Sequence, residues 1–169
     1  MLRALHLLLL KAYRRLPRRL RLAVIHGVAP SFTVGAICVV ERDDGRLLLV
    51  RHSYRDRWGF PGGLLNRNEE AEVGARREAR EEVGLHIEVV SEPTVVVAPE
   101  PRRVDVVFRC KVVGDPDVAE PRSPEIVECR WFERASLPEL QHEASGALVA
   151  LARATGEPGL KPSSGRRSR

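Results

Sequence analysis

A single segment, Gly62–Leu85 (GGLLNRNEEAEVGARREAREEVGL), restricts the fold of this chain more than any other part of it. Asn68 is of the residue types that cap the start of a helix, and three glutamates follow it within four residues, where the helix dipole favours negative charge. Gly84 stands just after the last residue with helical periodicity, which is the usual place for a glycine that ends a helix. The segment therefore predicts a helix of about four turns over residues 68–83.

Three carboxylates fall on one face of this expected helix. With about 100° between successive residues, Glu78, Glu81 and Glu82 lie within one narrow arc. Like charges so close together destabilise an isolated helix. A hard divalent cation removes that repulsion, because Mg²⁺ is bound by carboxylate oxygens together with water and phosphate oxygens. The alternative is an acidic face that is only solvated, and the spacing alone leaves both interpretations open.

The segment also resembles the signature of the Nudix hydrolase family, in which glycine, glutamate and arginine recur at fixed spacing. Ala79 stands where the signature has a bulky aliphatic residue, so this position is smaller than usual. The resemblance extends over about residues 31–153. The signature segment itself, residues 63–85, is called the Nudix box, and residues that flank this box also take part in the resemblance. The positions that match within the box are Gly63, Glu69, Arg77, Glu78, Glu81, Glu82, Gly84 and Leu85.

The resemblance implies an α/β fold, namely an α/β/α sandwich with a mixed central sheet. It implies that Glu81 and Glu82 are metal ligands, with the main-chain carbonyl of Gly63 as a third contributor. Glu78 is either a further ligand or the residue that orients the attacking water. Glu125 is the second candidate for the catalytic base, because a glutamate just before a late strand reaches the metal cluster in some relatives.

Two further pairs of residues have supporting roles in this interpretation. Glu69 and Arg77 are expected to brace the helix by pairing with each other rather than to touch substrate. Trp58 and Phe60 are candidates for stacking on a nucleotide base. Apolar residues beside a core serve packing more often than binding, so packing is the alternative for both of them.

The activity that the resemblance implies is hydrolysis at phosphorus. The expected enzyme uses Mg²⁺, for which Mn²⁺ can substitute, to cleave a diphosphate linkage in a nucleoside diphosphate-X substrate such as a nucleoside triphosphate, ADP-ribose or a nucleotide sugar. Metal ions on the phosphate oxygens neutralise charge, and a carboxylate accepts the proton of the attacking water. The alternative is a non-catalytic Nudix-fold nucleotide sensor or interaction domain, but such domains usually carry a broken box and this box is complete.

Charge divides the chain into three parts. The net charge is +5, yet residues 1–28 hold seven basic side chains and no acidic one, and residues 161–169 hold four more, so the part between them carries about −6. An acidic body argues against a broad nucleic-acid surface, which needs clustered lysine and arginine, and suits a site that collects divalent cations. We expect a basic amphipathic extension over 1–28, a Nudix hydrolase domain over 29–156 and a disordered tail over 157–169.

The N-terminal extension carries leucines at helical spacing from Leu2 to Leu16, and Pro17 should end that helix. Its apolar run is too short for a signal peptide or a membrane span. We expect the helix to pack on the domain; a surface for a partner or for a homodimer, and membrane contact, are the less favoured alternatives. The three cysteines are odd in number and widely spaced, which indicates a reduced, cytoplasmic protein.

The remaining elements follow from residue type and periodicity. Strands are expected over residues 32–41, 46–52, 58–63, 89–98, 104–113 and 126–132, where β-branched residues are concentrated. A closing amphipathic helix is expected over residues 141–155.

Overall fold

The computed structural model describes residues 11, 13–29 and 31–156, and the chain divides into two compact units, Met1–Phe32 and Thr33–Arg169. Most of the expected helix over residues 2–16 and the whole of the expected tail over 157–169 lie outside the described residues. In the first unit Pro17 separates a short helical stretch from helix α2 (Arg18–Val28), and its carbonyl accepts hydrogen bonds at the start of α2. In the described part of the chain, no helix is long and apolar enough to cross a membrane.

The second unit is built on an eight-stranded mixed sheet. Strands β1 (Thr33–Glu41) and β7 (Arg103–Val112) run parallel along their whole length, with Thr33 opposite Arg103 and Glu41 opposite Lys111. All the other pairings are antiparallel. Strand β4 (Gly62–Leu64) pairs with β1. Strand β2 (Leu47–His52) pairs with β8 (Ile126–Phe132), with β3 (Trp58–Gly59) and with one end of β1. Strands β5 (Ile87–Val89) and β6 (Thr94–Ala98) both pair with β7.

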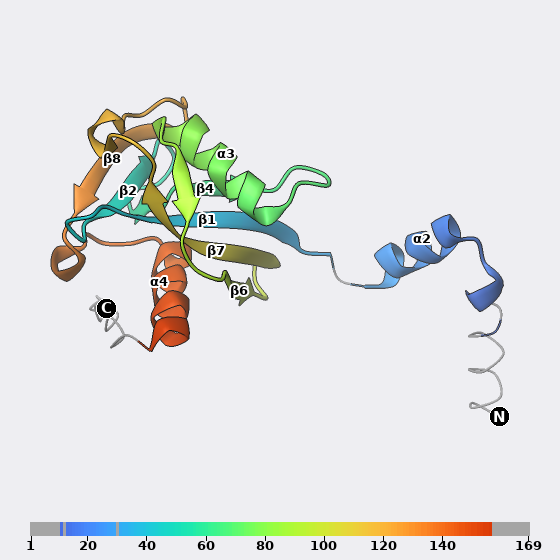
Figure 1. The fold of residues 1–169 in the computed structure, drawn as a ribbon. Helices are drawn as coiled ribbons and strands as arrows, with labels where there is room; N and C mark the ends of the chain where they lie inside the picture. The colour runs from blue at the N-terminus through green and yellow to red at the C-terminus, as the bar shows by residue number, and fades with distance from the viewer. Residues whose placement is uncertain (1–10, 12, 30, 157–169) are drawn as a thin grey trace. The chain divides into compact units, whose positions relative to one another are not determined.

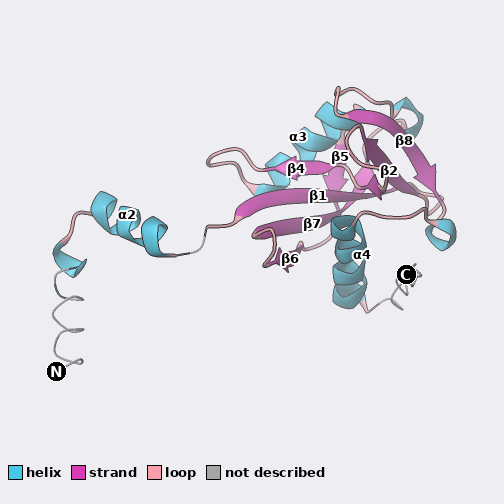
Figure 2. Ribbon diagram, turned by 180° about the vertical axis from the view of Figure 1, so that it is seen from behind, coloured by secondary structure: helices cyan, strands magenta, loops and turns pink. Residues whose placement is uncertain are grey.

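Two helices cover the two faces of the sheet, α3 (Ala71–Val83) on one side and α4 (His142–Thr155) on the other (Figure 1). Alternate residues of β1 explain the two layers, because successive side chains of a strand point to opposite faces. Ala36 and Cys38 belong to the cluster buried under α3, whereas Ile37 and Val39 belong to the cluster buried under α4. The view from behind in Figure 2 shows the same order of helix, sheet and helix. The α/β/α sandwich expected from the sequence is confirmed.

Most of the expected elements are present, and β8 and α4 match their predicted ranges to within one residue. The expected strand over residues 89–98 is wrong as a single strand. It is two strands, β5 and β6, which pair with different parts of β7. Pro93 lies in the gap between them, where its missing amide donor interrupts the ladder. The expected strand over residues 58–63 is likewise divided into β3 and β4.

The start of α3 also differs from the expectation. Asn68 does not cap the helix; it adopts a left-handed backbone conformation with φ of 63°, and Glu70 occupies the capping position. The reason lies in Glu69, whose carboxylate accepts a hydrogen bond from the backbone amide of Asn66 at 2.7 Å. The turn that allows this contact needs a residue that tolerates positive φ, and asparagine is among the few that do. The end of α3 is as predicted, with Gly84 in the left-handed conformation.

Candidate active site

A cleft of about 550 Å³ runs past the start of β4 and the exposed side of α3. Acidic side chains of α3 line one part of it, and Arg55 and Arg103 line another. Because the cleft combines carboxylates with guanidinium groups, it suits a ligand that is an anion and a cation that binds between that anion and the protein.

Helix α3 and strand β4 meet at Gly63, and the absence of a side chain there makes room for Glu78. A Cβ atom at Gly63 would lie 2.5 Å from the Glu78 Oε1 atom, closer than real Cβ contacts allow. Gly62 beside it has φ of 153°, a conformation that favours glycine. The two glycines thus let the backbone of β4 approach the carboxylate side of α3 closely.

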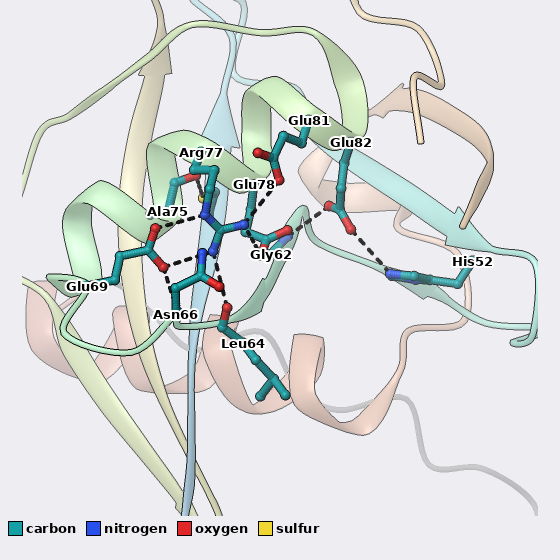
Figure 3. A network of polar contacts seen from close by, with 11 residues as sticks. His52, Gly62, Leu64, Asn66, Glu69, Ala75, Arg77, Glu78, Glu81 and Glu82 are labelled. Carbon is teal, nitrogen blue, oxygen red and sulfur yellow. Dashed lines mark hydrogen bonds and ion pairs between the residues drawn. The ribbon is translucent and has the colours of Figure 1, made fainter. Parts of the chain in front are cut away.

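One guanidinium group, that of Arg77, organises the acidic side of the cleft (Figure 3). Its Nε and Nη2 atoms donate to the two carboxylate oxygens of Glu69 at 2.8 and 2.9 Å. Its Nη1 atom donates to Glu78 at 2.7 Å and to Glu81 at 3.1 Å. A further bond from Nη2 to the carbonyl of Leu64 ties α3 to the end of β4. Glu69 and Arg77 therefore pair as the sequence predicted.

Glu82 is held separately from the other two carboxylates. It is buried, and its Oε2 atom accepts a hydrogen bond from the backbone amide of Gly62 at 3.0 Å. On its other side, the Nε2 atom of His52 lies 3.6 Å from Glu82 Oε1 (Figure 3). Gln141 is also buried, and its Nε2 atom lies 3.4 Å from the second ring nitrogen of His52. Each side of the Glu82 carboxylate is thereby fixed by a neighbouring element.

The pKa values of the acidic groups follow from these contacts. Hydrogen bonds from Arg77, and then from Asn66, lower the pKa of Glu69 to about 2. Burial raises the pKa of Glu78 above its ordinary value, and the charges of Glu82 and Glu81 act in the same direction, while Arg77 opposes them. Glu69 is therefore a permanent anion that serves structure, whereas Glu78 is a carboxylate that accepts protons more readily.

The donor set suits a hard divalent cation. Glu78, Glu81 and Glu82 line the cleft together with Gly63, so the available donors are carboxylate and main-chain carbonyl oxygens, which Mg²⁺ prefers over nitrogen and sulfur. Among the described residues, no three acidic, histidine or cysteine side chains converge closely enough to enclose a metal ion as they stand. Arg77 accounts for this, because it engages both Glu78 and Glu81. The half-exposed side chain of Glu81 has room to turn from Arg77 towards a cation.

The remaining predicted residues divide into those inside and those outside the cleft. Glu125 lines the cleft just before β8, and its charge adds to the effect of burial in raising the pKa of Tyr54. Phe60 contributes to the cleft wall but is almost fully buried among the core residues under α4. Trp58 is not among the lining residues; its ring packs edge-to-face on Phe132 with centroids 4.9 Å apart. The contacts of Trp58 favour the packing alternative for this residue.

Several lining residues were not found from the sequence. His52 and Gln141 support Glu82, and the Nη1 atom of Arg55 donates to Gln141 at 3.0 Å and to Glu143 at 3.1 Å. Burial opposes the ionisation of Glu143, but a backbone amide and then Arg55 outweigh it, so its pKa lies below the ordinary value. The site draws these residues from segments that are far apart in the chain, which periodicity does not reveal.

Arg103 and Asp105 were missed as well, although here the sequence held a signal. Asp105 is an acidic residue inside residues 104–108 of β7, which are otherwise apolar, and it is only 3% exposed. A buried carboxylate must be paired, and a basic residue two positions away on the same strand lies on the same face. The Nε atom of Arg103 indeed donates to both carboxylate oxygens, at 2.7 and 3.0 Å.

Comparison with known proteins agrees with this geometry. The chain is 39% identical over 104 residues to a MutT-like protein of Streptomyces ambofaciens, a match that covers 61% of this chain and 65% of that protein. It is 28% identical over 145 residues to a CMP-5'-(N-acetyl-N-hydroxy-3-aminopropyl)phosphonate hydrolase of Streptomyces rubellomurinus, covering 78% and 68% of the two chains. The matched region thus spans about two thirds of the length of each relative.

A solved structure and a family model cover the same region. The crystal structure of a NUDIX hydrolase from Nitrosomonas europaea superposes with a TM-score of 0.63 at 25% identity, covering 79% of this chain and 78% of that one. The NUDIX domain family model matches residues 31–152, which include the whole sheet, helix α3, most of α4 and every cleft residue described above. The chain therefore belongs to the NUDIX family.

Proposed function

We propose that this protein is a Mg²⁺-dependent hydrolase that cleaves a diphosphate linkage in a nucleoside diphosphate-X substrate. The observation that carries the proposal is the cleft, in which Glu78, Glu81, Glu82 and the Gly63 backbone stand beside three arginines. A complete set of oxygen donors next to cationic side chains suits a polyanion bound through a metal. A non-catalytic nucleotide sensor would not need these carboxylates.

The residues divide the chemical work between them. Glu78, Glu81, Glu82 and the carbonyl of Gly63 would hold the metal, which when bound supplies charge neutralisation at the phosphate oxygens and a more acidic water. Glu78 and Glu125 are the two candidates for the base that accepts the proton of the attacking water. Glu78 is favoured, because burial raises its pKa and so makes it a stronger proton acceptor. Arg77 and Glu69 keep α3 and the loop before it in position.

The substrate class rests on the family and on the size and charge of the cleft. A volume of about 550 Å³ is of the size that binds a ligand such as a nucleotide. One relative is named as a hydrolase of a CMP-linked phosphonate, and this supports a nucleoside 5'-phosphate joined to a second acid group. Nucleoside triphosphates, ADP-ribose and nucleotide sugars all meet this description.

A phosphate-release screen tests the proposal directly. Nucleoside triphosphates, ADP-ribose and nucleotide sugars would each be incubated with the protein and Mg²⁺. Inorganic pyrophosphatase would be added for the triphosphates, which release pyrophosphate, and alkaline phosphatase for the other substrates, whose products are phosphate monoesters. We expect turnover of at least one class, its loss on addition of EDTA, and its recovery with excess Mg²⁺ or Mn²⁺. Equal turnover in metal-free buffer would contradict the proposed metal dependence. Tight nucleotide binding without turnover of any class would support the sensor alternative instead.

A further inference from the structure

Arg103 differs from Arg77, another arginine of the cleft, in how its hydrogen-bond donors are used. Its Nε atom donates to both oxygens of Asp105, and within the described chain Asp105 is the only acceptor of its hydrogen bonds. Both terminal amino groups therefore retain their donors. Arg77 is the opposite case, because its Nε, Nη1 and Nη2 atoms all donate to protein groups. All three nitrogen atoms of the Arg77 guanidinium donate to protein groups, whereas only Nε of Arg103 does so.

Asp105 is placed so that it orients the guanidinium group of Arg103 but does not itself occupy the cleft where a ligand would bind. The side chain of Asp105 is only 4% exposed, while that of Arg103 is 23% exposed and reaches the cleft. A buried carboxylate fixes the plane of the guanidinium, which would otherwise have to be ordered when a ligand binds. This arrangement suits an anion-binding group that is held ready for its ligand.

The position of Arg103 is beside the expected metal site. Gly35 lies opposite Asp105 on the neighbouring strand, and it leaves open a space that three groups approach. A Cβ atom at Gly35 would lie 2.9 Å from Arg103 Nη2, 2.9 Å from the carbonyl oxygen of Gly63 and 2.6 Å from Asp105 Oδ1. Arg103 Nη2 and the Gly63 carbonyl are therefore close neighbours. A phosphate bound to a cation at the Gly63 carbonyl would therefore lie near this guanidinium.

We propose that Arg103 is a substrate-binding residue that donates hydrogen bonds to the phosphoryl oxygens of the diphosphate, and that Asp105 is the positioning residue that holds Arg103 in place. The inference rests on the proposed function for the identity of the ligand. Guanidinium groups bind phosphate with two parallel hydrogen bonds, which gives both affinity and a fixed orientation. This contact would hold the diphosphate near the Gly63 carbonyl, beside the carboxylates of α3 that line the same cleft.

A purely structural ion pair is the competing explanation, and β7 offers a matched control for it. Arg109 lies on the same strand and, six residues along, on the same face; its Nε atom is 3.2 Å from Glu41 and its side chain is 21% exposed. It is not among the residues that line the cleft. If the Arg103 pair only stabilises the sheet, Arg103→Gln and Arg109→Gln should have similar effects on every measurement.

Binding of a diphosphate that cannot be cleaved is the first test. Methylenediphosphonate would be titrated into the full chain with Mg²⁺ by calorimetry, for wild type, Arg103→Gln, Arg103→Lys and Arg109→Gln. We expect Arg103→Gln to raise Kd at least about tenfold, Arg103→Lys to raise it less because lysine keeps the charge but not the fork, and Arg109→Gln to leave it unchanged. A wild-type protein that does not bind the probe, or an Arg103→Gln variant that binds it equally well, overturns the inference.

The role of Asp105 is tested by a double-mutant cycle on the same probe. Asp105→Asn alone should raise Kd several-fold, whereas in the Arg103→Gln background it should add less than about twofold, because a positioning residue acts only through the group it positions. Additive effects would overturn the positioning role. Thermal melts check that each variant is folded. If Asp105→Asn is not folded, the Arg103 variants still test whether Arg103 binds phosphate.

The same variants separate this inference from the proposed function. If a nucleotide substrate is found, Arg103→Gln should raise its KM while Arg109→Gln does not. If Arg103→Gln turns over nucleotide with no change in KM or in probe binding, the proposed hydrolase activity stands and phosphate binding by Arg103 is overturned. If probe binding depends on Arg103 but no nucleotide is turned over, phosphate binding by Arg103 is supported and the proposed hydrolase activity is contradicted.

Discussion

Arg77 shows how much of the site depends on single side chains. Its guanidinium group contacts three carboxylates and one backbone carbonyl, and it joins α3, the loop before α3 and the end of β4. Removing it would leave Glu69 and Glu78, both largely shielded from water, without their main cationic partner. We therefore propose that Arg77 is a structural residue whose contribution to activity is indirect.

Glu82 is the carboxylate for which the largest kinetic effect is expected. Glu82→Gln keeps the size of the side chain and can still accept the hydrogen bond from the Gly62 amide, but it loses the charge that would hold a cation. We expect kcat to fall at least about 100-fold, with a smaller change in KM, in steady-state kinetics on the best substrate. Glu72→Gln, an exposed change on the same helix, is the control and should leave kcat unchanged. A fall in kcat of less than tenfold would make Glu82 a bystander.

Glu69 makes stability depend on pH in a defined direction. Its pKa is about 2 in the folded chain against an ordinary 4.5, so the ionised form stabilises the fold above about pH 4.5 and this contribution is lost as pH falls towards 2. We expect the stability difference between wild type and Glu69→Gln to be largest near neutral pH and to shrink below pH 4.5. Denaturant unfolding at several pH values measures it. A difference that stays constant from pH 6 to pH 3 would contradict the assignment.

Prediction from sequence succeeded at residues whose neighbours are close along the chain. The pairing of Glu69 with Arg77 and the common orientation of Glu78, Glu81 and Glu82 depend on one helix and the loop before it. His52, Gln141 and Arg103 reach the cleft only through pairing and packing of distant segments. Nothing in their local sequence states which segments will meet.

At the scale of elements, the approach of β4 to α3 is the feature on which the carboxylates depend. Gly63→Ala would place a methyl group 2.5 Å from the Glu78 carboxylate, so we expect Glu78 to be displaced and kcat to fall at least about tenfold. The protein should still fold, because Gly63 itself needs no positive φ. Steady-state kinetics together with thermal melts measure both effects.

A second glycine-to-alanine change provides the control for this prediction. In Gly146→Ala on α4 the new methyl group would meet only Val96, at an ordinary 3.6 Å. Alanine inside a helix is favoured over glycine by up to about 1 kcal/mol, so Tm should rise while kcat stays the same. If Gly63→Ala kept full activity, the close approach of β4 to Glu78 would have no functional importance.

The elements themselves were predicted to different degrees for physical reasons. Helix α4 and strand β8 were found with both ends, and α3 was found with its C-terminal end at Gly84. The break between β5 and β6 was missed, because both segments are rich in β-branched residues and the effect of Pro93 becomes clear only from their pairing with different parts of β7. The start of α3 was missed because the contact of Glu69 with Asn66 competes with the capping that Asn68 would otherwise provide.

At the scale of the whole molecule, all the cleft residues belong to the unit Thr33–Arg169. Deleting residues 1–28 should therefore leave kcat nearly unchanged. The deletion should lower thermal stability or solubility if the extension packs on the domain, as its leucine pattern predicts. Kinetics, thermal melts and light scattering of the shortened chain measure these outcomes. A large loss of kcat would show that the extension belongs to the catalytic machinery.

The alternatives for the extension have their own measurement. Helix α2 combines exposed Leu20, Val24 and Ile25 with arginines, a composition that is also typical of membrane-surface helices. Sedimentation of the full chain with anionic vesicles tests this. Salt-sensitive pelleting that disappears on deletion of residues 1–28 would favour membrane contact over packing.

The parallel pairing of β1 with β7 has a consequence for how the protein becomes active. It joins Gly35 to Asp105, seventy residues apart, across the middle of the sheet. Contacts of such high sequence separation are slow to form, because a long loop must close, at a cost in entropy, before the contact can stabilise the fold. Helix α3 ends before β7 begins, so a chain that stops between them carries every residue of the signature segment but lacks β7. Arg103 joins the cleft only when β7 pairs with β1, and such a shortened chain therefore has no finished site.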